Sequence, residues 1–233
     1  MEGLATIILA AGKGTRMKSG TAKVLHRIAG MPLLTYPVRA ACEAGCLPVI
    51  VVIGHQREQV EEAFQNQGLT FVYQEQQLGS GHAVMAAEEA LRGFSGDVLI
   101  LCGDVPLIRS QTLRDFVQAH RTAHAALSVL SVVVDDPTGY GRVVRTEQGE
   151  VIAIVEHRDA DEAQRRIREI NTGIYCCRAP LLFEALRRVR TDNDQGEYYL
   201  PDIVRIIGRD GHVVQAVAAS DPEEVQGIND RKD

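Results

Sequence analysis

The chain has 233 residues, of which 45% are hydrophobic and 24% charged. This composition is ordinary for a globular protein and excludes collagen, coiled-coil, low-complexity and disordered classes. The net charge of −6 argues against a general nucleic-acid binder. The sequence has no run of 18 apolar residues and no basic region at its amino-terminus, so we expect a cytoplasmic protein without membrane span or secretory signal.

Short apolar runs alternate with segments of helical periodicity through the first half of the chain. Strands are predicted at residues 4–9, 48–53, 69–73 and 98–102, and helices at 32–44, 57–65, 82–91 and 110–121. Gly45 is expected to end the first helix and Ser110 to cap the last. This alternation is typical of a mostly parallel sheet with helices on both faces. Ligands of such sheets bind at the carboxyl ends of strands.

The second half has a different pattern, with strand-like runs joined by turn residues. Strands are predicted at residues 126–134, 142–145, 151–157, 170–177 and 213–218, and helices at 159–168, 181–190 and 199–207. We interpret this half as a mixed continuation of the same sheet. Residues 1–233 are therefore expected to form a single domain.

The chain has five cysteines: Cys42, Cys46, Cys102, Cys176 and Cys177. Their number is odd and none forms a CxxC pair, so we expect buried free thiols in a reducing compartment. The carboxylate of Asp104 should raise the pKa of the neighbouring Cys102 thiol, which argues against cysteine catalysis.

The loop that follows the first predicted strand, LAAGKGTRM at residues 9–17, combines small residues with cations. Small residues let the backbone approach a ligand closely, and its N–H groups can cradle phosphate oxygens. Arg16 adds a planar donor fork suited to phosphate. The loop is neither a Walker A sequence nor a complete GxGxxG fingerprint. Taken alone, it is weak evidence, because a tight turn that binds nothing has the same pattern.

Asp104 follows Gly103 at the carboxyl end of the predicted strand 98–102. A carboxylate at this edge is well placed to hold Mg²⁺ that bridges phosphates. Position alone also fits an aspartate in a surface turn.

Eight short phrases in order resemble the sugar-nucleotide pyrophosphorylase family. The first is LAAGKGTRM followed by Lys23-Val24-Leu25. The others are QLGSGHA (77–83), GDVPL (103–107), DPTGYGR (136–142), VEH (155–157), INTGI (170–174), QGEYY (195–199) and GIN (227–229). Within the family, the chain most resembles the N-terminal uridylyltransferase domains of bacterial bifunctional N-acetylglucosamine-1-phosphate uridylyltransferases/glucosamine-1-phosphate acetyltransferases. The resemblance covers essentially the whole chain.

The resemblance implies a Rossmann-like, glycosyltransferase A-like nucleotidyltransferase fold: a mixed, mostly parallel sheet with helices on both faces and a small β extension. It implies Mg²⁺-dependent transfer of UMP from UTP to N-acetylglucosamine-1-phosphate, giving UDP-N-acetylglucosamine and pyrophosphate. A role in peptidoglycan precursor supply, and so in cell shape, follows by the same likeness. The hexapeptide-repeat β-helix that carries acetyltransferase activity in these relatives is absent from the sequence, so we expect no acetyl transfer and a monomer or weak oligomer.

The resemblance also implies roles for particular residues. Asp104 and Asn229 would bind Mg²⁺, and Arg16 and Lys23 would be the catalytic cations on the phosphates. Ala22 stands where the family usually has proline, which loosens the backbone before Lys23. The implied substrate-binding residues are Leu9, Ala10, Ala11, Gly12, Gly14, Lys23, Gly103, Asp104 and Asn229 for the nucleotide phosphates and metal, Gln74, Gln77, Gly79 and Ser80 for uracil, and Gly141, Glu156 and Asn171 for the sugar.

Two alternatives stay open. One keeps the fold but uses another nucleoside triphosphate or another sugar-1-phosphate. Against it, the glutamine amides present both a donor and an acceptor to an imide-type base such as uracil, and a carboxylate with an amide suits an N-acetylated sugar. The other alternative is a non-catalytic nucleotide-binding module, which would bind UTP without releasing pyrophosphate.

Overall fold

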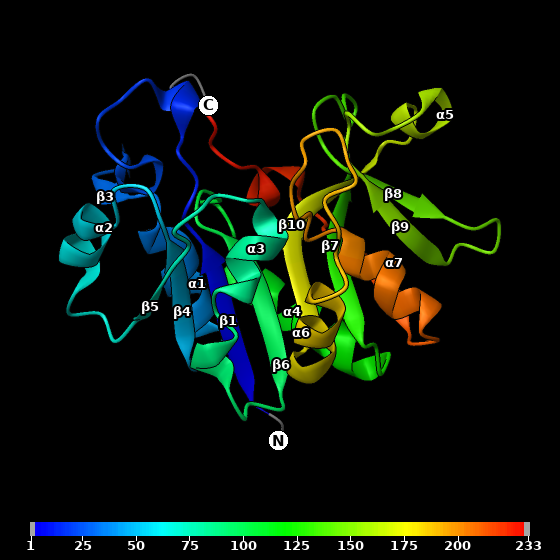
Figure 1. The fold of residues 1–233 in the computed structure, drawn as a ribbon, viewed down its shortest axis with the longest axis horizontal. Helices are drawn as coiled ribbons and strands as arrows, with labels where there is room; N and C mark the ends of the chain where they lie inside the picture. Colours follow the sequence, from blue (N-terminus) through cyan, green and yellow to red (C-terminus); the bar gives the residue numbers. More distant parts are fainter. Residues whose placement is uncertain (1–2, 231–233) are drawn as a thin grey trace.

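A computed structural model describes residues 3–230. Its centre is a nine-stranded sheet (Figure 1). The strands are β1 (Leu4–Leu9), β4 (Val49–Ile53), β5 (Thr70–Tyr73), β6 (Asp97–Cys102), β7 (Leu127–Val133), β8 (Arg142–Arg145), β9 (Val151–Val155), β10 (Glu169–Arg178) and β11 (Val214–Ala218). Their order is β11-β7-β10-β6-β1-β4-β5, with β8 attached to β10 and β9 to β8. The sheet runs without interruption through both halves of the sequence, as expected.

The sheet is parallel on one side and mixed on the other. β1 pairs in parallel with β4 and β6, β4 with β5, and β11 with β7. β10 is antiparallel to both β6 and β7, and the β8–β9 hairpin is antiparallel as well. The predicted α/β class with a mostly parallel sheet and a small β extension is confirmed.

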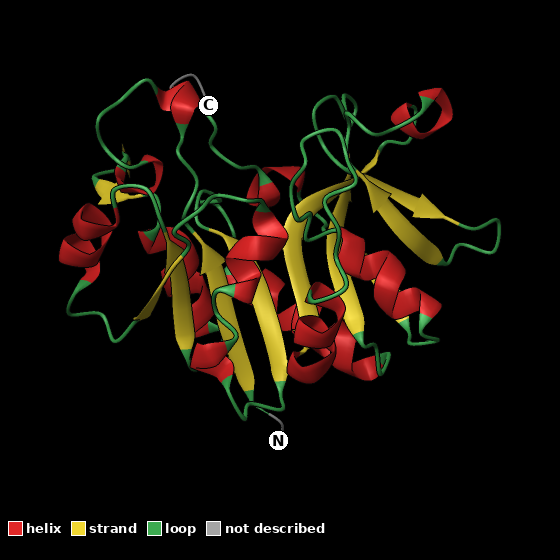
Figure 2. Ribbon diagram, in the orientation of Figure 1, coloured by secondary structure: helices red, strands yellow, loops and turns green. Residues whose placement is uncertain are grey.

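Helices cover both faces of the sheet (Figures 1 and 2). One face is covered by α3 (Ser80–Met85), α6 (Ala179–Leu186) and α7 (Asp202–Arg209), and the other by α1 (Thr35–Glu43), α2 (Arg57–Phe64) and α4 (Ser110–Thr122). Each layer buries one hydrophobic core, with Leu182 and Ile203 in the first and Phe64 and Phe116 in the second. The polar Thr6 of β1 is fully buried because its hydroxyl donates to the Leu99 carbonyl oxygen at 2.8 Å.

The remaining elements are short. The one-turn helix α5 (Glu162–Arg165) follows β9, and a two-stranded hairpin joins β2 (Arg27–Ile28) to β3 (Met31–Pro32). Within residues 3–230, four 3₁₀ turns complete the elements: η1 (Thr15–Met17), η2 (Lys23–Leu25), η3 (Glu89–Leu91) and η4 (Pro222–Val225). None of the helices within residues 3–230 is long and apolar enough to cross a membrane.

Several predicted boundaries were wrong. The helix predicted from residue 32 begins at Thr35, because Pro32 belongs to the β2–β3 hairpin. Ser110 is the first residue of α4 and not its cap; Arg109 holds the cap position without a side-chain hydrogen bond. Gly45 follows the α1 cap with a φ of +87°, as its predicted role requires. Cys42 is exposed, so the expectation of buried thiols fails for this cysteine.

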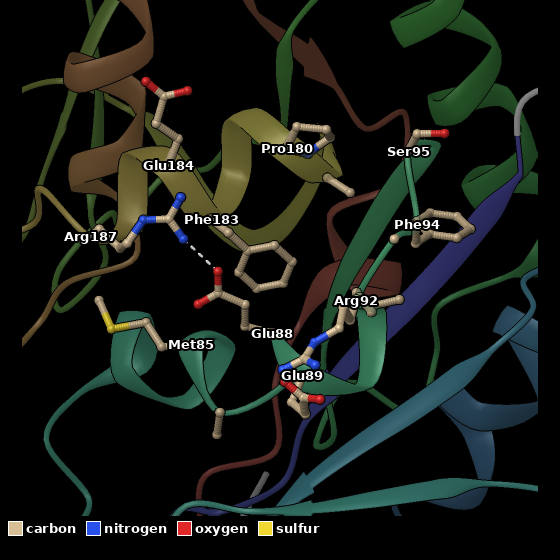
Figure 3. Close-up of a pocket in the computed structure, with 14 residues that line it drawn as sticks. Met85, Glu88, Glu89, Arg92, Phe94, Ser95, Pro180, Phe183, Glu184 and Arg187 are labelled. Atoms are coloured by element: carbon tan, nitrogen blue, oxygen red, sulfur yellow. Dashed lines mark hydrogen bonds and ion pairs between the residues drawn. The ribbon is translucent and has the colours of Figure 1, made fainter.

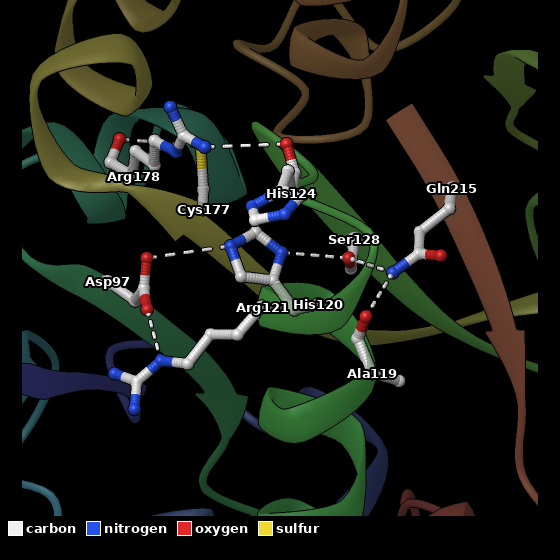
Figure 4. Close-up of polar contacts among 9 residues, drawn as sticks. All are labelled: Asp97, Ala119, His120, Arg121, His124, Ser128, Cys177, Arg178 and Gln215. Carbon is white, nitrogen blue, oxygen red and sulfur yellow. Dashed lines mark hydrogen bonds and ion pairs between the residues drawn. The ribbon is translucent and has the colours of Figure 1, made fainter. Parts of the chain in front are cut away.

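A buried polar network lies at the amino-terminal end of β6 (Figure 4). Nδ1 of His120 lies 2.8 Å from the Ser128 hydroxyl oxygen, and its Nε2 lies 3.5 Å from Oδ1 of Asp97. Arg121 Nε donates to the other Asp97 oxygen at 2.7 Å. The order Ser–His–Asp resembles a hydrolase triad, but Ser128 is fully buried and a substrate cannot reach it. The network is structural and ties α4 to β6 and β7.

Candidate active site

A pocket of about 390 Å³ opens at the carboxyl ends of the central parallel strands. These ends point to the upper edge in Figure 1, and the end of the described chain, drawn in red, returns to the same edge. The sequence-predicted residues that line the pocket are Leu9, Ala10, Ala11, Gly12, Gly14, Arg16, Lys23, Gln74, Gln77, Gly79, Ser80, Asp104 and Asn229. The pocket is also lined by residues without a predicted role, namely Val24, Ala83, Cys102 and Glu197.

Gly103 lies beside this pocket and does not line it. Its amide donates to the Leu9 carbonyl oxygen at 2.9 Å, which extends the β1–β6 ladder by one residue. A Cβ at this position would lie 3.0 Å from that same oxygen. Gly103 therefore lets the two strand ends stay close together and directs the chain into Asp104.

Lys23 connects the charged groups of the pocket. Its Nζ donates to Asp104 Oδ2 at 2.5 Å and to Asn229 Oδ1 at 3.1 Å. Arg16 Nη2 donates to the same Asn229 oxygen at 2.9 Å. The side chains of Lys23 and Asp104 are only 14% and 24% exposed, so their attraction is less screened than that of a surface pair. Four residues from distant parts of the sequence thus form one cluster.

The donor set of this cluster fits Mg²⁺. Asp104 and Asn229 offer oxygen atoms, the ligands that Mg²⁺ prefers, and protein-bound Mg²⁺ commonly uses one or two carboxylates together with substrate phosphates and water. Within residues 3–230, no group of three or more His, Cys, Asp or Glu side chains could hold a metal by itself. The arrangement therefore suits a cation that is shared with phosphates.

Gly14 allows Lys23 to reach the cluster. It has a φ of +57°, and a Cβ there would lie 2.6 Å from Cβ of Lys23. A Cβ on Gly12, in contrast, would meet nothing within 4 Å. The two glycines of the loop thus have different functions: Gly14 accommodates a side chain, and Gly12 leaves open space beside the backbone.

The predicted base-binding residues lie on the loop before α3 and, for Ser80, at the first residue of that helix. This part of the chain is paired with a second loop at 196–200. The amide of Gly81 donates to the Tyr198 carbonyl oxygen at 2.8 Å, and the Leu200 amide donates to the Ser80 hydroxyl at 3.0 Å. Gly79 has a φ of +109°, and a Cβ there would lie 2.6 Å from the Tyr198 oxygen. Gln74 is buried, and its Nε2 donates to the Gly79 carbonyl oxygen at 3.0 Å, so it also shapes this loop.

Gly54, which the sequence analysis missed, makes room for the second glutamine. A Cβ at Gly54 would lie 2.8 Å from Nε2 of Gln77 and 3.0 Å from the Gln74 carbonyl oxygen. A glycine directly after the buried strand β4 was the available signal, because glycine in such a position often marks close backbone approach.

The three predicted sugar residues form a second cluster outside the pocket lining. The Asn171 amide donates to the Gly141 carbonyl oxygen at 2.9 Å, and a Cβ on Gly141 would lie 3.1 Å from Oε1 of Glu156. Asn171 Oδ1 accepts from the Gly173 amide at 3.0 Å at an irregularity in β10. Gly173 in turn touches Cys102 on the pocket wall, where a Cβ would lie 2.8 Å from its sulfur. The second cluster therefore adjoins the first.

Two pKa values in this region are raised. Burial raises the pKa of Glu156, Asp159 raises it further, and Arg142 acts in the opposite direction. Burial, aided by Asp104, raises the pKa of the Cys102 thiol to about 12. The raising effect of Asp104 on this pKa agrees with the sequence-based prediction, and a raised pKa argues against a reactive thiolate at Cys102.

A larger pocket of about 930 Å³ lies between η3 and α6 (Figure 3). None of the predicted site residues lines it. Four of its five charged residues form two ion pairs, since Arg187 pairs with Glu88 at 2.5 Å and Arg92 pairs with Glu89. The smaller pocket holds the convergent charges and is the better candidate site.

Comparison with known families places the chain among nucleotide-using enzymes. The model of the MobA-like NTP transferase domain matches residues 6–199. Among solved structures, a Bacillus anthracis protein described as a glucose-1-phosphate thymidylyltransferase superposes with a TM-score of 0.76 at 21% identity, covering 93% of this chain and 87% of that one. A UDP-glucose pyrophosphorylase complexed with UDP-glucose gives 0.73 at 22% identity, covering 92% and 90%. These two structures support the fold.

Curated relatives are much closer in sequence. The bifunctional protein GlmU of Geobacter sulfurreducens is 52% identical over 232 residues, which are 99% of this chain and 49% of that protein. GlmU of Pelobacter propionicus is 51% identical over 99% of this chain and 50% of its own length. The chain spans about half the length of these relatives. With the family model matched over most of its length, this chain belongs to the MobA-like NTP transferase domain family and is a nucleotidyltransferase.

Proposed function

We propose that the chain transfers UMP from UTP to N-acetylglucosamine-1-phosphate in a Mg²⁺-dependent reaction that releases pyrophosphate. The observation that carries the proposal is the convergence of Arg16, Lys23, Asp104 and Asn229 in one pocket at the strand ends. Two cations beside two oxygen ligands are what a site for phosphates and a shared metal requires. The proposal is also supported by the GlmU proteins, which match nearly all of this chain with about half of their own length.

In the proposed reaction, a phosphate oxygen of the sugar phosphate attacks the α-phosphorus of UTP. The new P–O bond forms as the bond to the β,γ-pyrophosphate breaks, and pyrophosphate leaves in line. The attacking oxygen is already ionised near neutral pH, so no strong general base is needed. Catalysis then rests on positioning and on charge stabilisation.

Each residue of the pocket has a role in this scheme. Lys23 and Arg16 bind the phosphates and balance the negative charge that develops there. Asp104 and Asn229 would hold Mg²⁺, which supplies charge neutralisation on the phosphate oxygens when it is bound. Gly12 leaves the loop backbone open to the nucleotide.

We assign the selection of the base to the loop that carries Gln77 and Gly79. The selection of the sugar is assigned to the second cluster, around Glu156 and Asn171. Gln77 and the Gly79 backbone would read the uracil edge, with Gln74 holding the loop in place. Glu156 and Asn171 would hydrogen-bond the sugar hydroxyls and the N-acetyl group. Gly141, where a Cβ would lie 3.1 Å from Oε1 of Glu156, leaves room for this carboxylate.

The test is a pyrophosphate-release assay with UTP, N-acetylglucosamine-1-phosphate and Mg²⁺, with and without EDTA. Parallel reactions contain glucose-1-phosphate or each other nucleoside triphosphate. We expect release that needs the metal and prefers UTP with the N-acetylated sugar. Preferred release with another base or sugar would replace the proposed substrates while keeping the reaction type. Folded protein that binds UTP and never releases pyrophosphate would refute the proposal in favour of a binding module.

A further inference from the structure

The segment that brings Asn229 to the pocket is anchored at a distance from it. Residues 219–230 run from the end of β11 through η4 to the edge where the strands end (Figure 1). The Ala219 amide donates to the Ser131 carbonyl oxygen at 2.7 Å, which holds the start of the segment on β7. Residues 226–230 have no regular secondary structure, so individual backbone hydrogen bonds and side-chain anchors hold them in position.

Four side chains form such an anchor, which we call the η4 clamp: Arg109, Thr112, Asp221 and Glu224. Arg109 Nη2 donates to Asp221 Oδ2 at 3.3 Å, and its Nη1 lies 3.2 Å from Glu224 Oε1. The Thr112 hydroxyl donates to the other Glu224 oxygen at 2.5 Å. Asp221 also caps η4 by accepting from the Glu223 amide at 3.0 Å.

Glu224 is the buried member of the clamp. Its side chain is only 5% exposed, whereas Arg109 is 67% exposed. A buried carboxylate is costly unless it is paired and hydrogen-bonded, and Glu224 has both kinds of partner. The adjacent Val225 is 7% exposed and packs into the hydrophobic core that includes Phe116 of α4. Because Glu224 is both buried and paired, we infer that it fixes the position of the segment 219–230.

The clamp and the proposed metal ligands lie on the same two pieces of chain. Arg109 and Thr112 follow Asp104 at the start of α4, and Glu224 precedes Asn229 by five residues. At the pocket end, the Ile228 amide donates to the Asp104 carbonyl oxygen at 2.9 Å. The segment and the β6–α4 loop are therefore joined at two points, with Asn229 directly beyond the second.

We propose that the η4 clamp positions Asn229 beside Asp104 and so sets the affinity of this pair of oxygen ligands for a divalent cation. The clamp residues are positioning residues, since none of them lines the pocket. The cation-binding part of this inference rests on the proposed function. The positional part concerns the protein alone.

The positional part is tested by hydrogen exchange of the Ile228 amide, measured by NMR on the substrate-free protein. We expect Glu224→Ala and Thr112→Val to speed this exchange by about tenfold, because losing the clamp favours local opening of the segment. Thr112→Ser restores the hydroxyl and should exchange like the wild type. Glu223→Ala changes an exposed neighbour on the same turn and serves as the matched control. Unchanged exchange in both disruptive variants would overturn the inference.

The cation-binding part is tested by the Mg²⁺ concentration that gives half-maximal pyrophosphate release. Residues that orient metal ligands typically change metal affinity by about 10- to 100-fold, so we expect a rise of at least about tenfold in Glu224→Ala and none in Thr112→Ser or Glu223→Ala. A lower melting temperature with an unchanged Mg²⁺ requirement would show a merely structural role and overturn the inference. A wild-type protein without any release would refute the proposed function, while the Ile228 exchange would still decide whether the clamp holds the segment.

Discussion

Asp104 contacts both the charged residues of the pocket and the segment that carries Asn229. Its carboxylate faces Lys23, its backbone carbonyl accepts from Ile228, and Gly227 lies close enough that a Cβ there would be 3.5 Å from its Oδ1. A side chain with this many close neighbours acts through its charge and its shape together. Its replacement therefore needs a control for folding.

We predict that Asp104→Ala lowers kcat by about 10²-fold or more, the usual effect of removing one preorganised electrostatic group. Arg16→Ala should have an effect of similar size. The measurement is steady-state pyrophosphate release at saturating substrates and Mg²⁺, with melting curves to verify folding. Asp115→Ala, an exposed aspartate on α4, is the matched control. Near-normal turnover in both site variants would remove these residues from the catalytic machinery.

The raised pKa of Glu156 predicts a pH dependence of sugar binding. Because burial and Asp159 raise the pKa, the carboxylate is lost on acidification at a higher pH than for an ordinary glutamate. We therefore expect KM for the sugar phosphate to rise as the pH falls through this raised pKa. Glu156→Gln cannot ionise, so it should have a higher KM at pH 8 and a flatter profile. Parallel profiles for the two proteins would contradict the assigned role.

At the scale of the elements, the network of Asp97, His120 and Arg121 joins α4 to the sheet far from the pocket. Burial raises the pKa of Asp97, but the hydrogen bonds from His120 and Arg121 outweigh this effect and hold the pKa below its ordinary value. A carboxyl whose folded-state pKa is lowered stabilises the fold above its unfolded-state pKa of about 3.9. That stabilisation is lost as the pH falls through the folded-state pKa.

Accordingly, Asp97→Asn should lower the free energy of unfolding by about 2 kcal/mol at neutral pH, because the variant removes the carboxylate charge that accepts the hydrogen bond from Arg121 Nε. The difference from the wild type should shrink as the pH falls below about 4. Urea unfolding at both pH values measures the effect, with Asp115→Asn as the exposed control. A deficit that stays constant with pH would show that lost packing, and not charge, is responsible.

The elements that were predicted best are those with a local cause. The bounds of β1 were predicted correctly at Leu4–Leu9, since a strand buried on both faces has a nearly continuous apolar sequence. The helix predicted at 159–168 shortens to Glu162–Arg165 for two reasons. Its start is set locally, because Asp161 and Gln164 form a capping box. Its end is limited by a distant segment, since the Val134 amide donates to the Arg168 carbonyl oxygen at 3.1 Å. Periodicity within a segment does not contain that information.

The residues of the candidate site also divide into those with a local signal in the sequence and those without one. The glycine loop and Asp104 were identifiable as strand-end residues, and the structure places both at the pocket. Asn229 had no local signal, and only the resemblance pointed to it. Glu197 lies within a quoted phrase but received no role, and Glu224 lies outside every phrase. Both are brought into position by contacts between distant segments, which the order of residues alone does not reveal.

For the whole molecule, β10 is the connection between the two halves. It pairs with β6 on one side and with β7 on the other, so the parallel strands of the first half and the mixed strands of the second share one hydrogen-bonded sheet. Both hydrophobic cores pack on this sheet. We propose that residues 1–233 unfold as a single domain.

This proposal predicts one cooperative thermal transition, with equal calorimetric and van't Hoff enthalpies. Circular dichroism and tyrosine fluorescence should give coincident curves, because both cores pack on the central strands of one sheet. Val129→Ala in β7 should shift the whole transition to lower temperature without splitting it. Two resolved transitions would show that the halves fold independently.

The contact of Lys23 with both Asp104 and Asn229 has a consequence for the order of events at the pocket. The ammonium is a built-in counter-ion for the two oxygens that would receive a divalent cation, so a metal offered alone must compete with a tethered charge. A nucleotide changes this competition, because its phosphates give Lys23 another anion to approach. Nucleotide and metal should therefore each strengthen the binding of the other by the same factor, as thermodynamic linkage requires. For the proposed site we therefore expect weak binding of a divalent cation to the protein alone, and tighter binding once the nucleotide is bound.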